Sequence, residues 1–243
     1  MRGPKPLWYV GHGFRHNPFS IKPAIIHDRL IGQVETLEEV NSIVKDGGMC
    51  LIEGAFGVGK TTFLKSVIRR FAGKRKVLYF SCNRLLGRLN LDKLLHERLG
   101  VVGKLLKIKS KNMILLLDEA ENLAPADFEG VAKYLKKGYF RSVVFVTHDR
   151  KHIRASKSVM KDIPVFPLGS LTKEEAVDLV RSRIGNLSII SDNIIGKIYD
   201  ITPHSSRMFL KNCEDVCRHV VDHRHKRATK RNIREALARY IVT

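Results

Sequence analysis

The sequence predicts an α/β fold, in which a parallel five-stranded sheet carries helices on both faces and a small all-helical domain follows it. Three observations predict this fold. Short, continuous apolar runs recur through the first two thirds of the chain, helical patterns separate them, and no strand pattern returns after Leu171. Such runs are typical of parallel strands that are buried on both faces. We therefore expect an N-terminal arm and linker over residues 1–35, an α/β core over 36–169 and a helical lid domain over 170–243.

Each element of this fold has its own signal. The apolar runs that predict strands are 49–53, 77–82, 113–117, 143–147 and the weaker 164–168. The helical patterns are 61–71, 91–99, 127–135, a helix that starts at 172, 191–199, 205–219 and 229–241. The helix at Thr172 begins with a capping-box pattern, because Glu175 follows three residues later. The first 25 residues, rich in Pro, Gly and His, are expected to form an extended arm that wraps the core.

Composition narrows the class of protein and its partners. Lys and Arg total 44 against 24 acidic residues, so the formal net charge is +20. This balance favours a polyanionic partner, with nucleic acid first and an anionic membrane surface second. Apolar stretches are too short for a membrane span or a signal peptide, so a cytoplasmic location is expected. Four residues are expected to be reduced, buried thiols: Cys50, Cys82, Cys213 and Cys217.

A glycine-rich motif follows the first predicted strand and opens a helix, which is the context of a phosphate-binding loop. Its glycines let backbone N–H groups surround phosphates, and the helix N-terminus adds a positive dipole. Lys60 is expected to reach the β and γ phosphates of ATP, and the Thr61 hydroxyl to bind Mg²⁺. The nucleotide-binding residues are expected to be Gly54, Ala55, Phe56, Gly57, Val58, Gly59, Lys60, Thr61 and Thr62.

The third predicted strand ends in two acids, Asp118 and Glu119, beside the expected opening of that loop. Ligands of open α/β sheets bind at this edge. Asp118 is placed to hold Mg²⁺, and Glu119 to orient or deprotonate the attacking water. The pair predicts an ATPase, because a small-molecule kinase has little use for a water-activating glutamate.

Together these motifs resemble the AAA+ superfamily over nearly the whole chain. Residues 17–19 and 28–33 look like its N-linker and adenine-contacting region. The resemblance implies that Thr147 is a sensor of the γ-phosphate and that Arg207 reaches the same phosphate from the lid. Ser81 and Asn83 are candidates for the polar switch that restrains the catalytic glutamate.

Within AAA+, the run that begins at Asp118 is most similar to origin-recognition initiators and transposition regulators. The chain ends at Thr243, which leaves no length for a winged-helix domain, so sequence-tolerant rather than sequence-specific DNA binding is expected. An arginine finger in trans would make hydrolysis depend on a homo-oligomer, a ring or a filament. Arg154 is favoured for that role, and the other candidates are Arg150, Lys157 and Lys161.

Two basic clusters are candidates for DNA contact. One comprises Lys104, Lys107, Lys109 and Lys111, and the other Arg218, Arg224, Lys226, Arg227, Lys230, Arg231 and Arg234. The nearby cysteines and histidines are metal-ligand types, yet their apolar stripe favours a buried core over zinc. The sequence thus predicts an ATPase that acts with DNA in replication initiation, transposition or mobile-element maintenance. The alternatives are an NTPase switch with a protein partner and a membrane-associated secretion ATPase.

Overall fold

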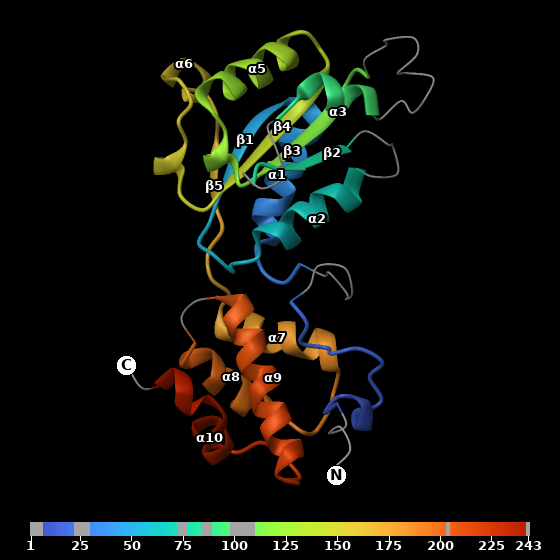
Figure 1. The fold of residues 1–243 in the computed structure, drawn as a ribbon, viewed down its shortest axis with the longest axis vertical. Coiled ribbons are helices and arrows are strands. Elements are labelled where there is room, and N and C mark those ends of the chain that lie inside the picture. The colour runs from blue at the N-terminus through green and yellow to red at the C-terminus, as the bar shows by residue number, and fades with distance from the viewer. Residues whose placement is uncertain are drawn as a thin grey trace, which may run out of the picture. The chain divides into compact units, whose positions relative to one another are not determined.

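The computed structural model describes residues 7–21, 30–71, 77–83, 89–97, 110–202 and 205–241. It divides into two compact units, which are considered separately (Figure 1). One unit comprises residues 33–56 and 60–169 and contains the sheet. The other comprises residues up to 32, the short segment 57–59 and residues from 170 onwards, and it is mainly helical. Within the described ranges, no helix is long and apolar enough to cross a membrane.

The sheet has five parallel strands in the order β2-β3-β4-β1-β5, which confirms the predicted fold class. The strands are β1 (Gly48–Glu53), β2 (Val77–Ser81), β3 (Met113–Asp118), β4 (Phe140–Thr147) and β5 (Val165–Pro167). Their register brings the carboxyl ends to one edge, since Ser81 pairs with Asp118 and Glu53 pairs with Thr147. Polar residues that follow different strands therefore lie close together.

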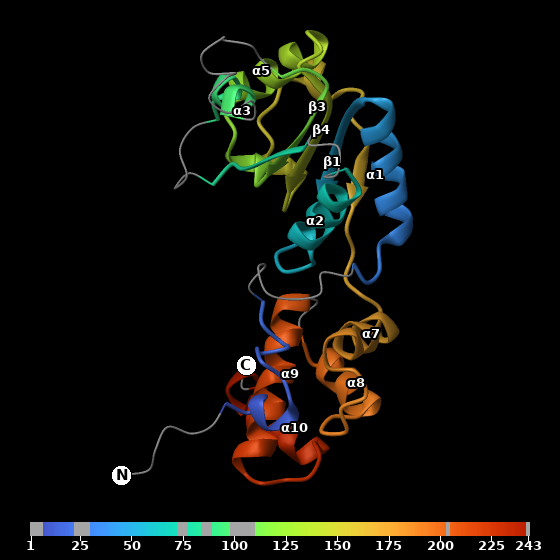
Figure 2. The same ribbon diagram turned by 90° about the vertical axis from the view of Figure 1, so that its right-hand side faces the viewer.

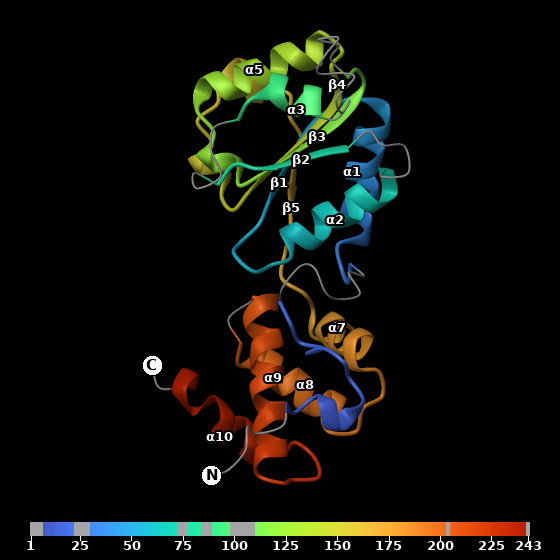
Figure 3. The same ribbon diagram turned by 45° about the vertical axis from the view of Figure 1, so that its right-hand side comes forward.

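Helices cover both faces of this sheet, as Figure 3 shows. On one face lie α1 (Val34–Asp46) and α2 (Lys60–Phe71), and on the other lie α3 (Leu91–Glu97) and α5 (Pro125–Lys136). The Ser142 hydroxyl in β4 donates to the Val44 carbonyl in α1 at 2.7 Å. Every residue of β3 is buried, as expected for a central parallel strand. Short elements complete the unit: η4 (Ala120–Asn122), η5 (Arg150–His152) and α6 (Lys157–Met160).

The helical unit contains α7 (Lys173–Ile184), α8 (Asp192–Asp200), α9 (Ser206–Asp222) and α10 (Lys230–Ile241) (Figure 2). The predicted capping box forms at the start of α7. The Glu175 amide donates to the Thr172 hydroxyl at 3.2 Å, and the Thr172 amide donates to the Glu175 carboxylate at 2.8 Å. Cys213 and Cys217 lie in the hydrophobic core of this unit, and all four cysteines are free and buried, as predicted.

The N-terminal region differs from the sequence-based expectation in two ways. Helix α1 was not predicted. The described part of the arm also contains a short helix, η1 (Val10–His12), and packs into the core of the helical unit instead of wrapping the α/β core. Trp8 and Phe19 are buried there with their rings stacked at 5.7 Å. These two large rings therefore find their apolar surroundings in the core of the helical unit.

Candidate nucleotide-binding site

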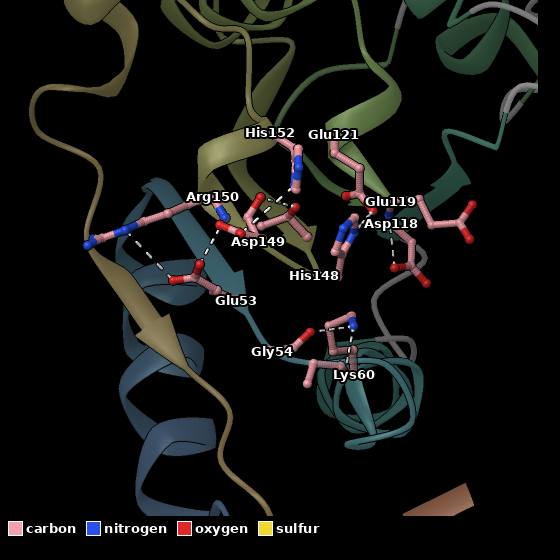
Figure 4. Close-up of polar contacts among 12 residues, drawn as sticks. Glu53, Gly54, Lys60, Asp118, Glu119, Glu121, His148, Asp149, Arg150 and His152 are labelled. Carbon is pink, nitrogen blue, oxygen red and sulfur yellow. Dashed lines mark hydrogen bonds and ion pairs between the residues drawn. The ribbon is translucent and has the colours of Figure 1, made fainter. Parts of the chain in front are cut away.

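The loop between β1 and α2 has the backbone that the glycine-rich motif predicts. Gly57 and Gly59 have φ angles of 78° and 114°, a region that side-chain-bearing residues rarely adopt. The Lys60 ammonium turns back over the loop and donates to the carbonyls of Gly54, at 2.6 Å, and Ala55, at 3.1 Å (Figure 4). It also lies 5.4 Å from the centre of the Phe56 ring. The loop therefore holds a cation at the point where a helix begins.

Asp118 ends β3 with only 7% of its surface exposed. Its two oxygens accept hydrogen bonds from the Tyr79 hydroxyl at 3.1 Å and from the Glu119 amide at 3.0 Å. Burial raises the pKa of Asp118, although both hydrogen bonds and the charge of Lys60 oppose the shift. Burial likewise lowers the pKa of Lys60, and the negative charge of Asp118 opposes that shift. Burial therefore disfavours the charged form of both Asp118 and Lys60, and a nearby opposite charge stabilises it.

Glu119 follows with an unusual backbone, because its φ of 57° and ψ of 42° place it in the left-handed region. A residue with a side chain adopts this conformation at an energetic cost, and such residues are concentrated at functional sites. Its carboxylate accepts a hydrogen bond from the Ser81 hydroxyl at the end of β2, at 3.2 Å. The structure thus brings Ser81, one of the two candidates for the polar switch, to the glutamate.

The end of β4 contributes a buried hydroxyl and an imidazole. The Thr147 hydroxyl donates to the Asp149 carbonyl at 3.1 Å. Next to it, His148 Nδ1 lies 2.5 Å from the Glu121 carboxylate, and its ring is 5.3 Å from that of Phe56 in the phosphate loop. Burial acts to raise the pKa of Glu121, but hydrogen bonds from the backbone and from His148 outweigh it, and the pKa is lowered. Figure 4 shows this pair on the same side as Asp118 and Lys60.

Sequence reasoning did not identify Tyr79, Glu121 or His148 as site residues. Glu121 had a weak signal, as a third acid two residues after Glu119. Tyr79 and His148 come from β2 and from the end of β4. Only the strand order, which places β3 between β2 and β4, brings them to the same edge as Asp118.

The remaining predicted residues lie farther along the chain. Arg150 is held within its own chain, since its amide donates to the Glu53 carboxylate at 2.8 Å. Arg154 and Lys161 are exposed, between η5 and α6 and just after α6. Arg207 is exposed in the first turn of α9, in the helical unit. Several predicted residues fall outside the described ranges: Asp28, Arg29, Lys104, Lys107, Lys109, Pro203 and His204.

Comparison with known proteins agrees with this geometry. Residues 46–163 match the sequence model of a family described as AAA domain. This part of the chain is therefore similar to an AAA domain. The predicted resemblance to AAA+ P-loop ATPases is thereby supported. No curated protein matches the chain in a sequence search.

Solved structures share the fold of this chain at low sequence identity. Cdc6p from Pyrobaculum aerophilum superposes with a TM-score of 0.70 at 17% identity, over 93% of this chain and 71% of that one. Drosophila ORC bound to DNA superposes with a TM-score of 0.67 at 14% identity, over 100% of this chain and 70% of that one. RuvB, the Holliday junction branch migration motor of Thermotoga maritima, superposes with a TM-score of 0.64 at 14% identity, over 88% of this chain and 71% of that one.

Proposed function

We propose that this AAA+ chain binds ATP with Mg²⁺, hydrolyses it, and acts on or with DNA. One observation carries the proposal: the Lys60 ammonium, the Asp118 carboxylate and the Glu119 carboxylate lie at one edge of the sheet (Figure 4), beside a loop in which a side chain added at Gly59 would meet no atom within 4 Å. The charges of these side chains are suited to binding ATP with Mg²⁺. A phosphate near Lys60 and a cation near Asp118 would each supply the opposite charge that burial makes favourable there.

Each residue of the site has a separate proposed role in hydrolysis. Lys60 neutralises phosphate charge, while the Thr61 hydroxyl and Asp118 hold the metal. Bound Mg²⁺ supplies further neutralisation of the phosphate oxygens. Glu119 orients the attacking water and accepts its proton, and the Ser81 hydroxyl holds that carboxylate until the site is filled. We propose that Thr147, at the end of β4, contacts the γ-phosphate of ATP. Arg207, in the helical unit, is the second proposed sensor of that phosphate.

The DNA part of the proposal has separate support. The chain carries a formal net charge of +20, which favours a polyanion. Among proteins of the same fold, one is described as bound to DNA and another as a Holliday junction motor. The process that we propose is replication initiation, transposition or mobile-element maintenance. We further propose that ATP drives self-assembly and that hydrolysis resets it.

The test measures ATP hydrolysis at low salt with and without double-stranded DNA. We expect DNA to raise the rate several-fold, and Lys60→Ala and Glu119→Gln each to abolish it. Lys136→Ala, an exposed change on α5, is the control and should behave like the wild type.

Three other outcomes would count against parts of the proposal. Hydrolysis that survives Lys60→Ala would remove the assigned site. Hydrolysis that is indifferent to DNA would favour a switch with a protein partner. Stimulation by anionic vesicles in place of DNA would favour a membrane-associated ATPase.

A further inference from the structure

The turn between α9 and α10 concentrates positive charge on the surface of the helical unit. We call residues 223–231 the basic turn. Its sequence is His-Arg-His-Lys-Arg-Ala-Thr-Lys-Arg, with no acidic residue. The cationic side chains are all exposed, namely Arg224, Lys226, Arg227, Lys230 and Arg231. Five of the seven residues of the basic cluster predicted here from the sequence therefore lie exposed on this short segment, while Arg218 and Arg234 lie in α9 and α10.

The backbone of the basic turn is fixed by hydrogen bonds at both ends. At the end of α9, the Arg224 amide donates to the Val221 carbonyl at 3.0 Å and the His225 amide to the Val220 carbonyl at 2.9 Å. This pair of bonds is a Schellman motif. Toward α10, Ala228 is buried and its amide donates to the Ile189 carbonyl at 2.7 Å. The cations are thus presented by an ordered connection, which lowers the entropic cost of binding a ligand.

One of these cationic residues, Arg224, has a backbone conformation that is unfavourable for a residue with a side chain. Arg224 has a φ of 57°, in the left-handed region. It occupies the position after the helix end at which glycine is favoured, because glycine has no Cβ to clash there. An arginine at this position strains the fold, and among the described residues its side chain forms no hydrogen bond or ion pair that would compensate the strain. Such strain is typical of residues that serve binding.

The charges of the basic turn are only partly neutralised within the chain. Arg231 donates to Glu235 at 2.7 Å, and the same carboxylate lies 3.1 Å from His219. Among described residues, no carboxylate forms an ion pair with Arg224, Lys226 or Arg227. These three cations remain available for an external anion.

We propose that the basic turn binds the phosphate backbone of double-helical DNA. Guanidinium groups suit phosphate oxygens, and the N-terminus of α10 adds a positive dipole at Lys230. A membrane surface fits less well, because none of the large exposed hydrophobic side chains of the described chain lies on this turn. A single strand also fits less well, because the turn has no Phe, Tyr or Trp on which bases could stack.

This inference rests on the proposed action with DNA and names the surface that provides it. The test compares two triple variants of the full chain by fluorescence anisotropy with a labelled DNA duplex over a salt series. The first carries Arg224→Gly, Lys226→Ser and Arg227→Ser. The second is a matched control on the exposed end of α5, with Lys133→Ser, Lys136→Ser and Lys137→Ser. Each removes three positive charges, so a difference between them reports on position and not on net charge.

We expect the turn variant to bind the duplex at least about tenfold more weakly than the wild type. Its slope of log affinity against log salt should be smaller by about 1 to 3, while the control should change affinity less than about threefold. Equal losses in both variants would show that only net charge matters and would overturn the inference. Preferential binding to a single strand or to anionic vesicles would assign the turn to another ligand. If the wild type binds no DNA, the proposed function itself fails.

The single change Arg224→Gly separates binding from folding. We expect it to raise the melting temperature by about 2 °C or more, because the strain at this residue is relieved, and to weaken duplex binding at the same time. Basal ATP hydrolysis without DNA should not change. A variant that is less stable, or that binds DNA as well as the wild type, would contradict the assigned role.

Discussion

Asp118 is a carboxylate whose folded environment opposes its charge. Burial raises its pKa above the ordinary value of 3.8, so the folded chain holds this proton more tightly than the unfolded chain does. The resulting destabilisation is absent below the ordinary pKa, grows as the pH rises through the raised pKa, and is fully present above it. Without nucleotide and metal, the charge needed for function therefore lowers the stability of the fold at neutral pH.

Replacing Asp118 by Asn should consequently stabilise the protein while removing its activity. An amide can still pair with the Tyr79 hydroxyl and the Glu119 amide. We expect the melting temperature at pH 7.5 to rise by about 2–4 °C, which corresponds to about 1 kcal/mol for a chain of this size, and the gain to shrink toward acidic pH. Mg²⁺-ATP should stabilise the wild type but not the variant. A variant that melts lower than the wild type at pH 7.5 would refute this account of the charge.

His148 is the residue at this edge that connects the phosphate loop with an acid. Glu121 holds its Nδ1 at 2.5 Å, which directs the other ring nitrogen away from the acid, and the ring lies against Phe56. We expect this imidazole to position the phosphate or the water. His148→Ala should then lower kcat at least about tenfold with little change in KM for ATP.

His152 is the matched control for that change, because its ring stacks on His148 at 5.1 Å but its side chain is 60% exposed. His152→Ala should keep near-normal kcat. Conversely, equal effects of the two substitutions, or a change confined to KM, would show that His148 only supports the loop.

At the scale of elements, sequence patterns predicted what depends on local periodicity. The apolar runs identify all five strands, and Thr172 with Glu175 identifies the start of α7. They did not predict α1, because no continuous apolar run marks this segment and its apolar residues, among them Val40, Ile43 and Val44, alternate with charged and polar ones, so it was taken as linker and core entry.

The core against which the N-terminal arm packs also could not be predicted from the sequence. Trp8 and Phe19 indicate burial, but only tertiary packing decides which core receives them. The same holds for the candidate site. Lys60, Asp118 and Glu119 follow from motifs within single segments, whereas Tyr79 and His148 depend on the order of strands in the sheet.

At the scale of the whole molecule, hydrolysis needs positive charge at the phosphates when the bond breaks. Within one chain, Lys60 supplies such a charge, while Arg150 is tied to Glu53 at 2.8 Å through its amide and at 3.9 Å through its guanidinium. Arg154 is exposed in the segment where an arginine finger was predicted, and we propose that it serves a neighbouring copy. We therefore expect ATP-dependent assembly in which each site is completed by the next chain.

Mixing experiments distinguish a finger in trans from a residue that acts within its own chain. Arg154→Ala should bind ATP normally but hydrolyse it at least about tenfold more slowly, and Glu119→Gln should also be nearly inactive. A mixture of the two should regain activity, because Glu119→Gln chains supply the arginine and Arg154→Ala chains keep an intact glutamate. Lys161→Ala is the nearby control and should hydrolyse normally. If the mixture stays as inactive as its components, Arg154 acts in its own chain or not at all, and specific activity independent of protein concentration would argue against assembly altogether.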